Sequence, residues 1–305
     1  MHKILRHKAG FHFKCLVNIQ FFTDFVKGFL ASNERFNIGI RSAYLCVLLS
    51  SAGFSAFEDT IPGVRAASMA GSGVGRPLAA ESIFINPAAI LDGSTIDVVI
   101  FYTRPYELTD LALGSAAGCC RRGALAVGGA VQHFGNTLYN ETQYHFSAAW
   151  QLFDRLAVGT NVRYSVLAIK SYGRASSVLF DLGALARLSP RVQWGIVVKN
   201  ANNARLGRAR EPLPHIMCSG ISVAAVDDFR INVDLYKDVR FPLDVRAGLA
   251  YSLFSVLELR LGVGSAPSRM SGGFSIFLKF CRLDYSYDSH IDLGATHAFS
   301  IGFCR

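Results

Sequence analysis

The chain has 305 residues, of which 51% are hydrophobic and only 17% charged, and its mean hydropathy is +0.29. A soluble domain usually carries about a quarter charged residues, so much of this surface need not face water. No run of about 18 apolar residues occurs, which excludes membrane-spanning helices on length. The composition therefore leaves either a very apolar soluble protein or a transmembrane β-barrel.

The formal net charge of +9 is concentrated near the N-terminus. Residues 1–42 hold seven Lys or Arg and two acids, a net charge of +5, whereas the remainder holds 24 and 20, a net charge of +4. The basic residues outside this region are dispersed, so we do not expect a nucleic-acid partner.

Residues 41–56 have the pattern of a bacterial secretory signal peptide. A basic residue precedes a short apolar run, and small residues then permit cleavage after Ser55 or Ala52. The competing interpretation is a buried core strand. Residues 1–40 are unusual for the basic region of a leader, so either the leader is long or translation starts downstream of Met1. We take residues 1–55 as the leader.

Residues 56–94 form a second region, rich in small residues with scattered apolar ones. This composition suits a coil that packs closely against other backbone. Gly71, Gly73 and Gly75 superficially suggest a phosphate-binding loop. However, no strand precedes them and an Arg-Pro pair follows, so the structural context of a nucleotide site is missing.

From residue 95 to residue 305 the dominant pattern is alternation with period two, which predicts antiparallel strands with one apolar face. In 256–264, for example, three Leu and one Val alternate with Glu258, Arg260 and glycines. We expect strands near 95–104, 124–134, 141–151, 155–168, 176–187, 191–200, 213–225, 228–237, 242–253, 255–264, 269–280, 280–288 and 296–304. Bacterial barrels prefer an even strand number, so we expect 12 or 14 strands, with 14 if 109–118 is a short strand.

A soluble β-sandwich would show the same alternation, and the polar face decides between the two folds. That face is mostly Gly, Ala, Ser and Asn with isolated charges, which suits a narrow lumen better than a solvent-facing sheet. The lumen-facing charges are Arg163, Arg230, Asp234, Asp244, Arg246, Glu258 and Arg260. They form either a structural ladder of ion pairs, since buried charges need partners, or a charged constriction that selects solutes.

Two motifs resemble the FadL-type outer-membrane transport proteins. The first is Gly63-x-Arg65-Ala66-x-x-Met69-x-Gly71-x-Gly73, followed by Asn86-Pro87-Ala88. The second is a C-terminal series that includes Leu283-Asp284-Tyr285 and Leu293-Gly294-Ala295-Thr296-His297. Together they cover the chain from about residue 63 to residue 303. The cysteine use and the divergence are similar to those of a spirochaete branch of the family.

The resemblance implies an all-β transmembrane barrel of 14 strands in the bacterial outer membrane, with residues 56–94 folded inside as a plug, or hatch. The plug motif is then Gly63, Arg65, Met69, Gly71, Gly73, Asn86, Pro87 and Ala88. The implied function is uptake or binding of hydrophobic small molecules such as long-chain fatty acids, gated by the plug. The implied partners are membrane lipid, the hydrophobic ligand and the machinery that inserts barrels. Family transporters are longer, with extended extracellular loops, and this chain ends in Cys304-Arg305 rather than in an aromatic residue.

The sequence contains no catalytic signature: no Gly-x-Ser-x-Gly, no His-Glu-x-x-His and no P-loop. The five cysteines beyond the leader include no Cys-x-x-Cys, and the adjacent Cys119 and Cys120 are either a redox pair or small residues at a strand end. We therefore expect no catalytic residues, no metal, no cofactor and no enzyme activity. The alternative function is a plugged structural or secretion-associated barrel with a protein partner, and a simple diffusion porin comes third.

Overall fold

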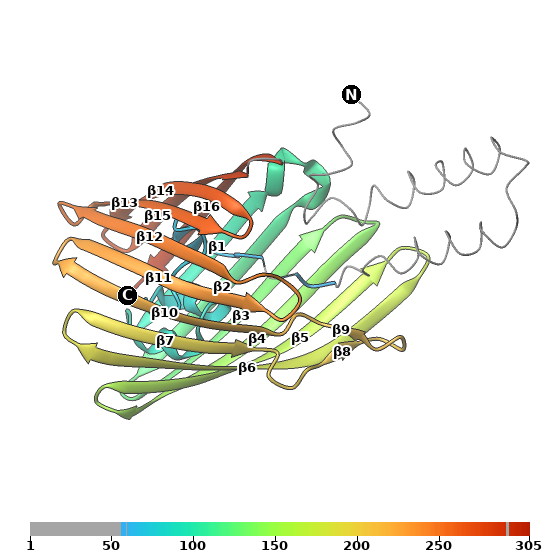
Figure 1. The fold of residues 1–305 in the computed structure, drawn as a ribbon, viewed down its shortest axis with the longest axis horizontal. Coiled ribbons are helices and arrows are strands. Elements are labelled where there is room, and N and C mark those ends of the chain that lie inside the picture. Colours follow the sequence, from blue (N-terminus) through green and yellow to red (C-terminus); the bar gives the residue numbers. More distant parts are fainter. Residues whose placement is uncertain (1–55, 59, 291–292) are drawn as a thin grey trace, which may run out of the picture. The chain divides into compact units, whose positions relative to one another are not determined.

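A computed structural model describes residues 56–58, 60–290 and 293–305. The predicted signal peptide and its cleavage sites before residue 56 lie outside these residues. Fourteen strands form a closed antiparallel barrel in which β1 pairs with both β2 and β16 (Figure 1). The barrel strands are β1 (Ile96–Arg104), β2 (Leu113–Arg122), β3 (Leu125–Gly135), β4 (Tyr139–Phe153), β5 (Leu156–Ile169), β6 (Gly173–Ser189), β7 (Val192–Lys199), β10 (Ile216–Val226), β11 (Phe229–Asp238), β12 (Asp244–Leu253), β13 (Leu257–Ser265), β14 (Ser268–Leu278), β15 (Cys281–His290) and β16 (Gly294–Cys304). Two short strands, β8 (Arg205–Leu206) and β9 (Glu211–Pro212), pair separately.

The higher of the two predicted strand numbers is therefore confirmed. The uncertain strand exists, but it begins at Leu113 and ends at Arg122, so the predicted bounds of 109–118 were wrong. The residues before it form two short 3-10 helices instead, η3 (Pro105–Glu107) and η4 (Thr109–Leu111). Pro105 has no backbone N–H and a fixed φ, which explains why pairing stops there and resumes only later.

The alternation observed in the sequence separates the two faces of the wall. In β11 the Val233 and Leu235 side chains are 44% and 48% exposed, whereas Asn232 and Asp234 between them are 0% and 1% exposed. The sheet closes on itself instead of meeting a second sheet, so the sandwich alternative is excluded. An outward apolar band around a closed antiparallel barrel is the architecture of outer-membrane-type transmembrane barrels. No helix among the described residues has the length and apolar character needed to cross a membrane.

The two ends of the barrel carry different connections. At the end where β1 starts and β16 finishes, the turns are short; only two residues join β2 to β3 and β4 to β5. The opposite end carries longer connections, including residues 105–112 and residues 200–215, which contain β8 and β9. We call these the short-turn end and the long-loop end. In outer-membrane barrels short turns face the periplasm and longer loops the outside.

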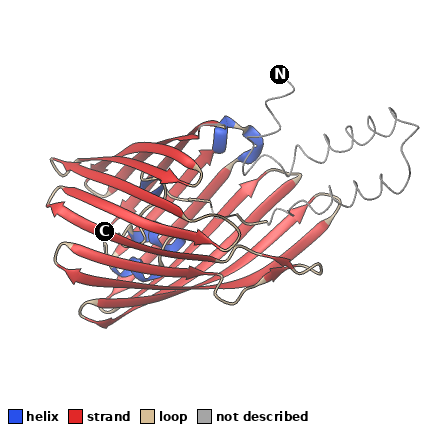
Figure 2. Cartoon of the chain, viewed as in Figure 1, coloured by secondary structure: helices blue, strands red, loops and turns tan. Residues whose placement is uncertain are grey.

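Residues 60–94, which we call the luminal segment, lie inside the barrel. The segment contains α3 (Val64–Ala67), η1 (Ala79–Phe84) and η2 (Pro87–Leu91). Helix α3 contacts β14–β16, η1 contacts β1–β3, and η2 contacts β2–β6. Contacts with strands on several sides of a closed barrel place the segment within it, and Figure 2 shows short helices among the strands.

The chain crosses the lumen from one end to the other before it enters β1. At the long-loop end, the Phe57 N–H donates to Glu141 Oε1 at 3.1 Å, and Phe57 packs with Leu206 and Leu213 of the β7–β10 connection. At the short-turn end, Asp92 pairs with Arg187 at 2.6 Å.

Inward-facing glycines on the wall leave room for this close packing. A Cβ atom on Gly262 would lie 2.3 Å from the Met69 carbonyl carbon, and one on Gly159 would lie 2.4 Å from the Ala88 nitrogen. One on Gly195 would lie 2.1 Å from the Val74 carbonyl oxygen. These neighbours are backbone atoms, which have no rotamer by which to move away. The small residues predicted for the lumen thus accommodate protein backbone.

Candidate functional site

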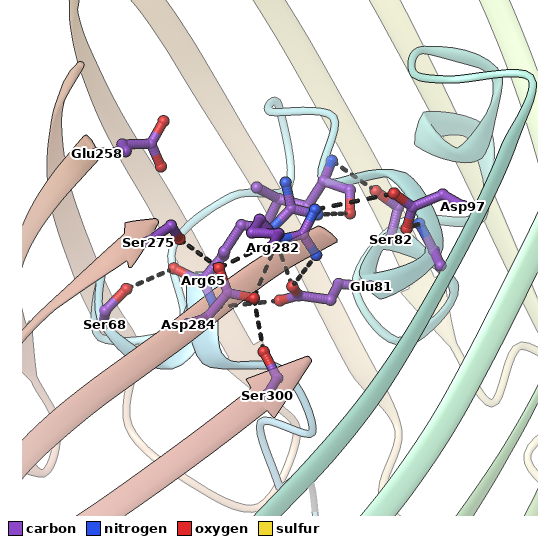
Figure 3. Close-up of polar contacts among 12 residues, drawn as sticks. Arg65, Ser68, Glu81, Ser82, Asp97, Glu258, Ser275, Arg282, Asp284 and Ser300 are labelled. Carbon is purple, nitrogen blue, oxygen red and sulfur yellow. Dashed lines mark hydrogen bonds and ion pairs between the residues drawn. The ribbon is translucent and has the colours of Figure 1, made fainter. Parts of the chain in front are cut away.

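A buried network of ion pairs joins the luminal segment to the wall, and its centre is Glu81 (Figure 3). The Glu81 side chain is completely buried. It accepts hydrogen bonds from Arg65 Nε at 2.9 Å and from the Arg65 backbone N–H at 3.1 Å. From β15, Arg282 Nη2 reaches the same carboxylate at 3.5 Å. One carboxylate thus connects a helix of the luminal segment with a barrel strand.

From Arg282 the network continues along the wall. Its guanidinium lies 3.8 Å from Asp97 and 3.0 Å from Asp284. Asp284 also accepts hydrogen bonds from the Ser275 and Ser300 hydroxyls. These contacts join four consecutive strands of the wall, β14, β15, β16 and β1, around one arginine.

A second branch runs through β13. Arg260 Nη1 donates to Ser275 Oγ and to Glu258 Oε1, both at 2.7 Å. Glu258 in turn accepts from Arg76 Nη2 of the luminal segment at 2.8 Å. The luminal segment is therefore bound to the wall through both branches.

The network is balanced in charge. Its cations are Arg65, Arg76, Arg260 and Arg282, and its anions are Glu81, Asp97, Glu258 and Asp284. Because each buried charge has partners, removal of one group would leave another uncompensated, which costs far more than an exposed pair contributes.

The seven predicted lumen charges all face inward, but they do not form the single ladder that we considered. Glu258 and Arg260 join the network above. Asp244 pairs with Arg246 at 2.7 Å and with Arg269 at 3.3 Å, a separate group.

The other three predicted charges have different partners. Arg163 pairs with Asp181 at 2.8 Å. Asp234 accepts from the backbone N–H groups of Gly73 at 2.7 Å and Val74 at 2.9 Å. Arg230 donates to the Ser222 hydroxyl at 3.2 Å. No continuous ladder forms, because the pairs along the wall stay in separate groups and Asp234 binds the inner chain instead.

Among the predicted plug residues, Gly63, Arg65 and Met69 lie around α3. Gly63 precedes the helix, where a Cβ atom would lie 2.5 Å from Glu81 Oε2. Met69 is completely buried against the wall. Gly71 and Gly73 follow with φ angles of +78° and +146°, which favour glycine.

Asn86, Pro87 and Ala88 form the start of η2. Asn86 Oδ1 accepts from the Ala88 N–H at 3.1 Å, which caps the helix, and Pro87 is its first residue. Asn86 Nδ2 donates to the carbonyl oxygens of Val74 at 2.9 Å and Ala184 at 3.1 Å. The Asn-Pro-Ala motif thus links two parts of the inner chain and β6.

Sequence reasoning missed several members of the network, chiefly Glu81, Asp97, Arg282 and Asp284. Arg282 and Asp284 alternate with apolar residues, as the predicted lumen charges do, so the same rule would have found them. Glu81 also carried a signal, because it is the one acid between residues 60 and 91. An isolated acid among small and apolar residues has to be buried with a cation.

Two cavities lie between the luminal segment and the wall. The first, the apolar cavity, has a volume of about 30 Å³. Its apolar lining includes Ile61, Val74, Ile85, Val197, Cys218 and Tyr236. The second, the polar cavity, has a volume of about 20 Å³. Its polar lining includes Glu58, Gln132, Gln143, His145, Asn161, Arg163, Asp181 and Lys199.

The network meets the apolar cavity at Glu81, which is part of the cavity lining, and extends from there towards the short-turn end. Lys199, which lines both cavities, is the last residue of β7 at the long-loop end. Asp97, Glu258 and Arg282 are each the second residue of a strand that starts at the short-turn end. The network therefore forms a floor beneath the two cavities. At the long-loop end, burial raises the pKa of Glu58 to about 7.

The described residues bring together no cluster of three or more potential metal ligands. All five of their cysteines have free thiols. Cys119 is buried and Cys120 is exposed near the end of β2, which fits the interpretation as small residues at a strand end.

Solved structures with a similar fold include a hydrocarbon channel, a toluene transporter and a FadL homologue. No family model matches the sequence, and a search of curated proteins also found no match. The CymD monoaromatic hydrocarbon channel aligns with a TM-score of 0.62 and 16% identity, over 82% of this chain and 99% of that one. The Pseudomonas putida toluene transporter TodX aligns with a TM-score of 0.58 and 11% identity, over 80% and 97%. A Pseudomonas aeruginosa FadL homologue aligns with a TM-score of 0.58 and 11% identity, over 82% and 99%. The chain thus has the 14-stranded barrel fold of the FadL-type outer-membrane channels.

Proposed function

We propose that this protein takes up hydrophobic small molecules across the bacterial outer membrane, with the luminal segment as the gate. The observation that carries the proposal is the apolar cavity, which lies inside the barrel between the wall and the luminal segment. An apolar cavity with a few convergent polar groups is the usual form of a small-molecule site. The three similar structures are a hydrocarbon channel, a toluene transporter and a FadL homologue, which supports a transport role rather than an enzymatic one.

The cavity volume favours compact ligands. At about 30 Å³ the cavity has room for only one or two water-sized groups. Any ligand therefore needs space from a movement of the luminal segment, and a compact ligand needs less of it than an extended one. An extended long-chain fatty acid, which the sequence resemblance suggested, would need additional space from a movement of the luminal segment. We therefore propose compact hydrophobic molecules of about the size of a substituted benzene, and fatty acids stay a prediction to be tested in parallel.

Passage through the barrel requires the luminal segment to move. Its ion pairs with the wall lie beneath the cavities, at the short-turn end, so release of this floor would open a path towards the periplasm. The N–H groups of Gly73 and Val74 bind Asp234, and Val74 lines the apolar cavity. We propose that a ligand in this cavity competes with those contacts. Interaction with membrane lipid and assembly by the barrel insertion machinery stay predictions.

The experiment compares wild-type protein with a variant that lacks residues 60–94, both reconstituted in liposomes. Uptake of radiolabelled toluene and of a radiolabelled long-chain fatty acid is measured together with planar-bilayer conductance. Wild-type protein should be nearly silent in conductance but take up toluene, whereas the deletion variant should conduct ions continuously. The proposal is wrong if wild-type protein neither binds nor transports either compound.

The density of contacts around the luminal segment favours a second candidate function, a barrel with a permanently seated plug that serves a structural or secretion-associated role. Buried ion pairs and backbone contacts at wall glycines both oppose movement. For this function we expect no ligand binding, no conductance during ligand addition, and a stoichiometric protein partner retained through purification.

A further inference from the structure

We infer that the polar cavity is a subsite for an uncharged hydrogen-bonding group, such as the hydroxyl of an otherwise hydrophobic ligand. This inference rests on the proposed function and narrows its substrate class to compact alcohols and phenols. The two cavities share Thr60, Pro62, Phe84 and Lys199 in their linings. A ligand whose polar group occupies the polar cavity can therefore place its apolar part in the apolar cavity.

The first observation is a buried donor that has no partner in the described part of the chain. His145 is 4% exposed and lines the polar cavity, and its Nε2 makes no hydrogen bond there. Its ring packs edge-on against Phe84 with the centroids 5.0 Å apart. A buried polar group without a partner costs about 1–3 kcal/mol, which favours a ligand atom at that position.

The hydrogen bonds of Asn161 define which imidazole nitrogen carries the proton. Asn161 Oδ1 accepts from the Ser147 hydroxyl at 3.0 Å. Its Nδ2 faces the Ile83 carbonyl and the Asp181 carboxylate, both at 3.3 Å, which are acceptors only. The same Nδ2 lies 3.1 Å from His145 Nδ1, so that nitrogen accepts and the proton of the neutral ring sits on Nε2. The group without a partner is therefore an N–H donor.

The charges of the cavity favour an uncharged acceptor over a carboxylate. Arg163 contacts both oxygens of Asp181, with Nη2 at 2.8 Å from Oδ1 and Nε at 2.8 Å from Oδ2. Only Nη2 makes a hydrogen bond in this pair, and the opposite charges of the two groups compensate each other. The test is set at pH 8, where Glu58, whose pKa burial raises to about 7, is ionised; its charge then offsets that of Lys199, the other remaining charged group of the lining. The two glutamines, Gln132 and Gln143, add neutral amides that both donate and accept.

The test uses three ligands of one shape: toluene, 4-methylphenol and 4-methylbenzoate. Equilibrium dialysis measures their binding to the full chain folded in detergent micelles. We expect 4-methylphenol to bind more tightly than toluene and 4-methylbenzoate to bind no more tightly than toluene. His145→Phe should reduce the preference for 4-methylphenol about tenfold, the effect of one buried hydrogen bond, and leave toluene within about twofold.

His133→Phe is the matched control, because His133 lies on β3, is exposed, and contacts Thr142. It should keep the wild-type preference. Toluene binding shows whether the His145 variant is folded. If it is not, ¹⁵N-histidine NMR of the wild-type protein replaces it: 4-methylphenol, and not toluene, should shift the Nε2–H resonance.

The other possible results of the binding test separate this inference from the proposed function. Equal affinity for toluene and 4-methylphenol would overturn the inference while leaving the proposed function intact. Tighter binding of 4-methylbenzoate would show an anion site instead. No binding of any of the three compounds would remove the proposed function itself.

Discussion

Replacement of Gly262 by alanine should displace the luminal segment. The added Cβ atom would lie 2.3 Å from the carbonyl carbon of Met69, 2.5 Å from its Cα and 2.4 Å from the nitrogen of Ala70. Carbon atoms in contact prefer about 3.5–4.0 Å, so this backbone has to retreat by about 1 Å or more. Overpacking of this kind costs about 1–3 kcal/mol, which shifts an equilibrium between seated and displaced forms by about 5–150-fold.

Planar-bilayer conductance measures that shift, because a displaced segment opens the lumen. We expect the fraction of time in conducting states to rise in Gly262→Ala by a factor within that range. Gly129→Ala is the control: its Cβ would make an ordinary 3.6 Å contact with the His145 carbonyl oxygen, and residue 129 is exposed. Heat-modifiable migration on gels verifies that both variants fold. A folded Gly262→Ala protein as silent as wild type would refute the steric argument.

Three further predictions concern two acidic residues and the lipid-facing side of the wall. Glu81→Ala should lower the free energy of unfolding in detergent by about 3–5 kcal/mol, because Arg65 and Arg282 lose their shared carboxylate. The control is Asp227→Asn, in an exposed pair with Arg191, which should change that free energy by about 1 kcal/mol or less. Equal effects of the two substitutions would contradict the network. Burial raises the pKa of Glu58 to about 7, so the folded state favours the protonated form of Glu58. The stability that this group contributes is fully present below the ordinary pKa of a glutamic acid and is lost as the pH rises through about 7. Protease cleavage near residues 56–58 should therefore increase from pH 5 to pH 8 in wild type and stay constant in Glu58→Gln; a flat wild-type profile would disprove this. Leu261→Arg, at the middle of the outward face of β13, should impair refolding into vesicles by about 2–4 kcal/mol, and undiminished refolding would mean that this face does not meet lipid.

The sequence by itself determined the wall of this protein. Alternation of Leu and Val with Glu258, Arg260 and glycines in β13 assigned one face to lipid and the other to the lumen. This assignment is local, because side chains in a strand point to opposite sides with period two. The start of β2 was predicted four residues too early, since the length of a connection leaves no periodic signal.

The tertiary structure decided the contents of the lumen. Arg282 and Glu81 meet although 201 residues separate them in sequence, and the inner chain brings Asp234 to the backbone of Gly73 and Val74 instead of to an arginine. Such pairs depend on how β1 closes on β16 and on the path of residues 60–94 through the barrel. Periodicity shows that a charge points inward, but only closure of the barrel determines which charge lies across from it.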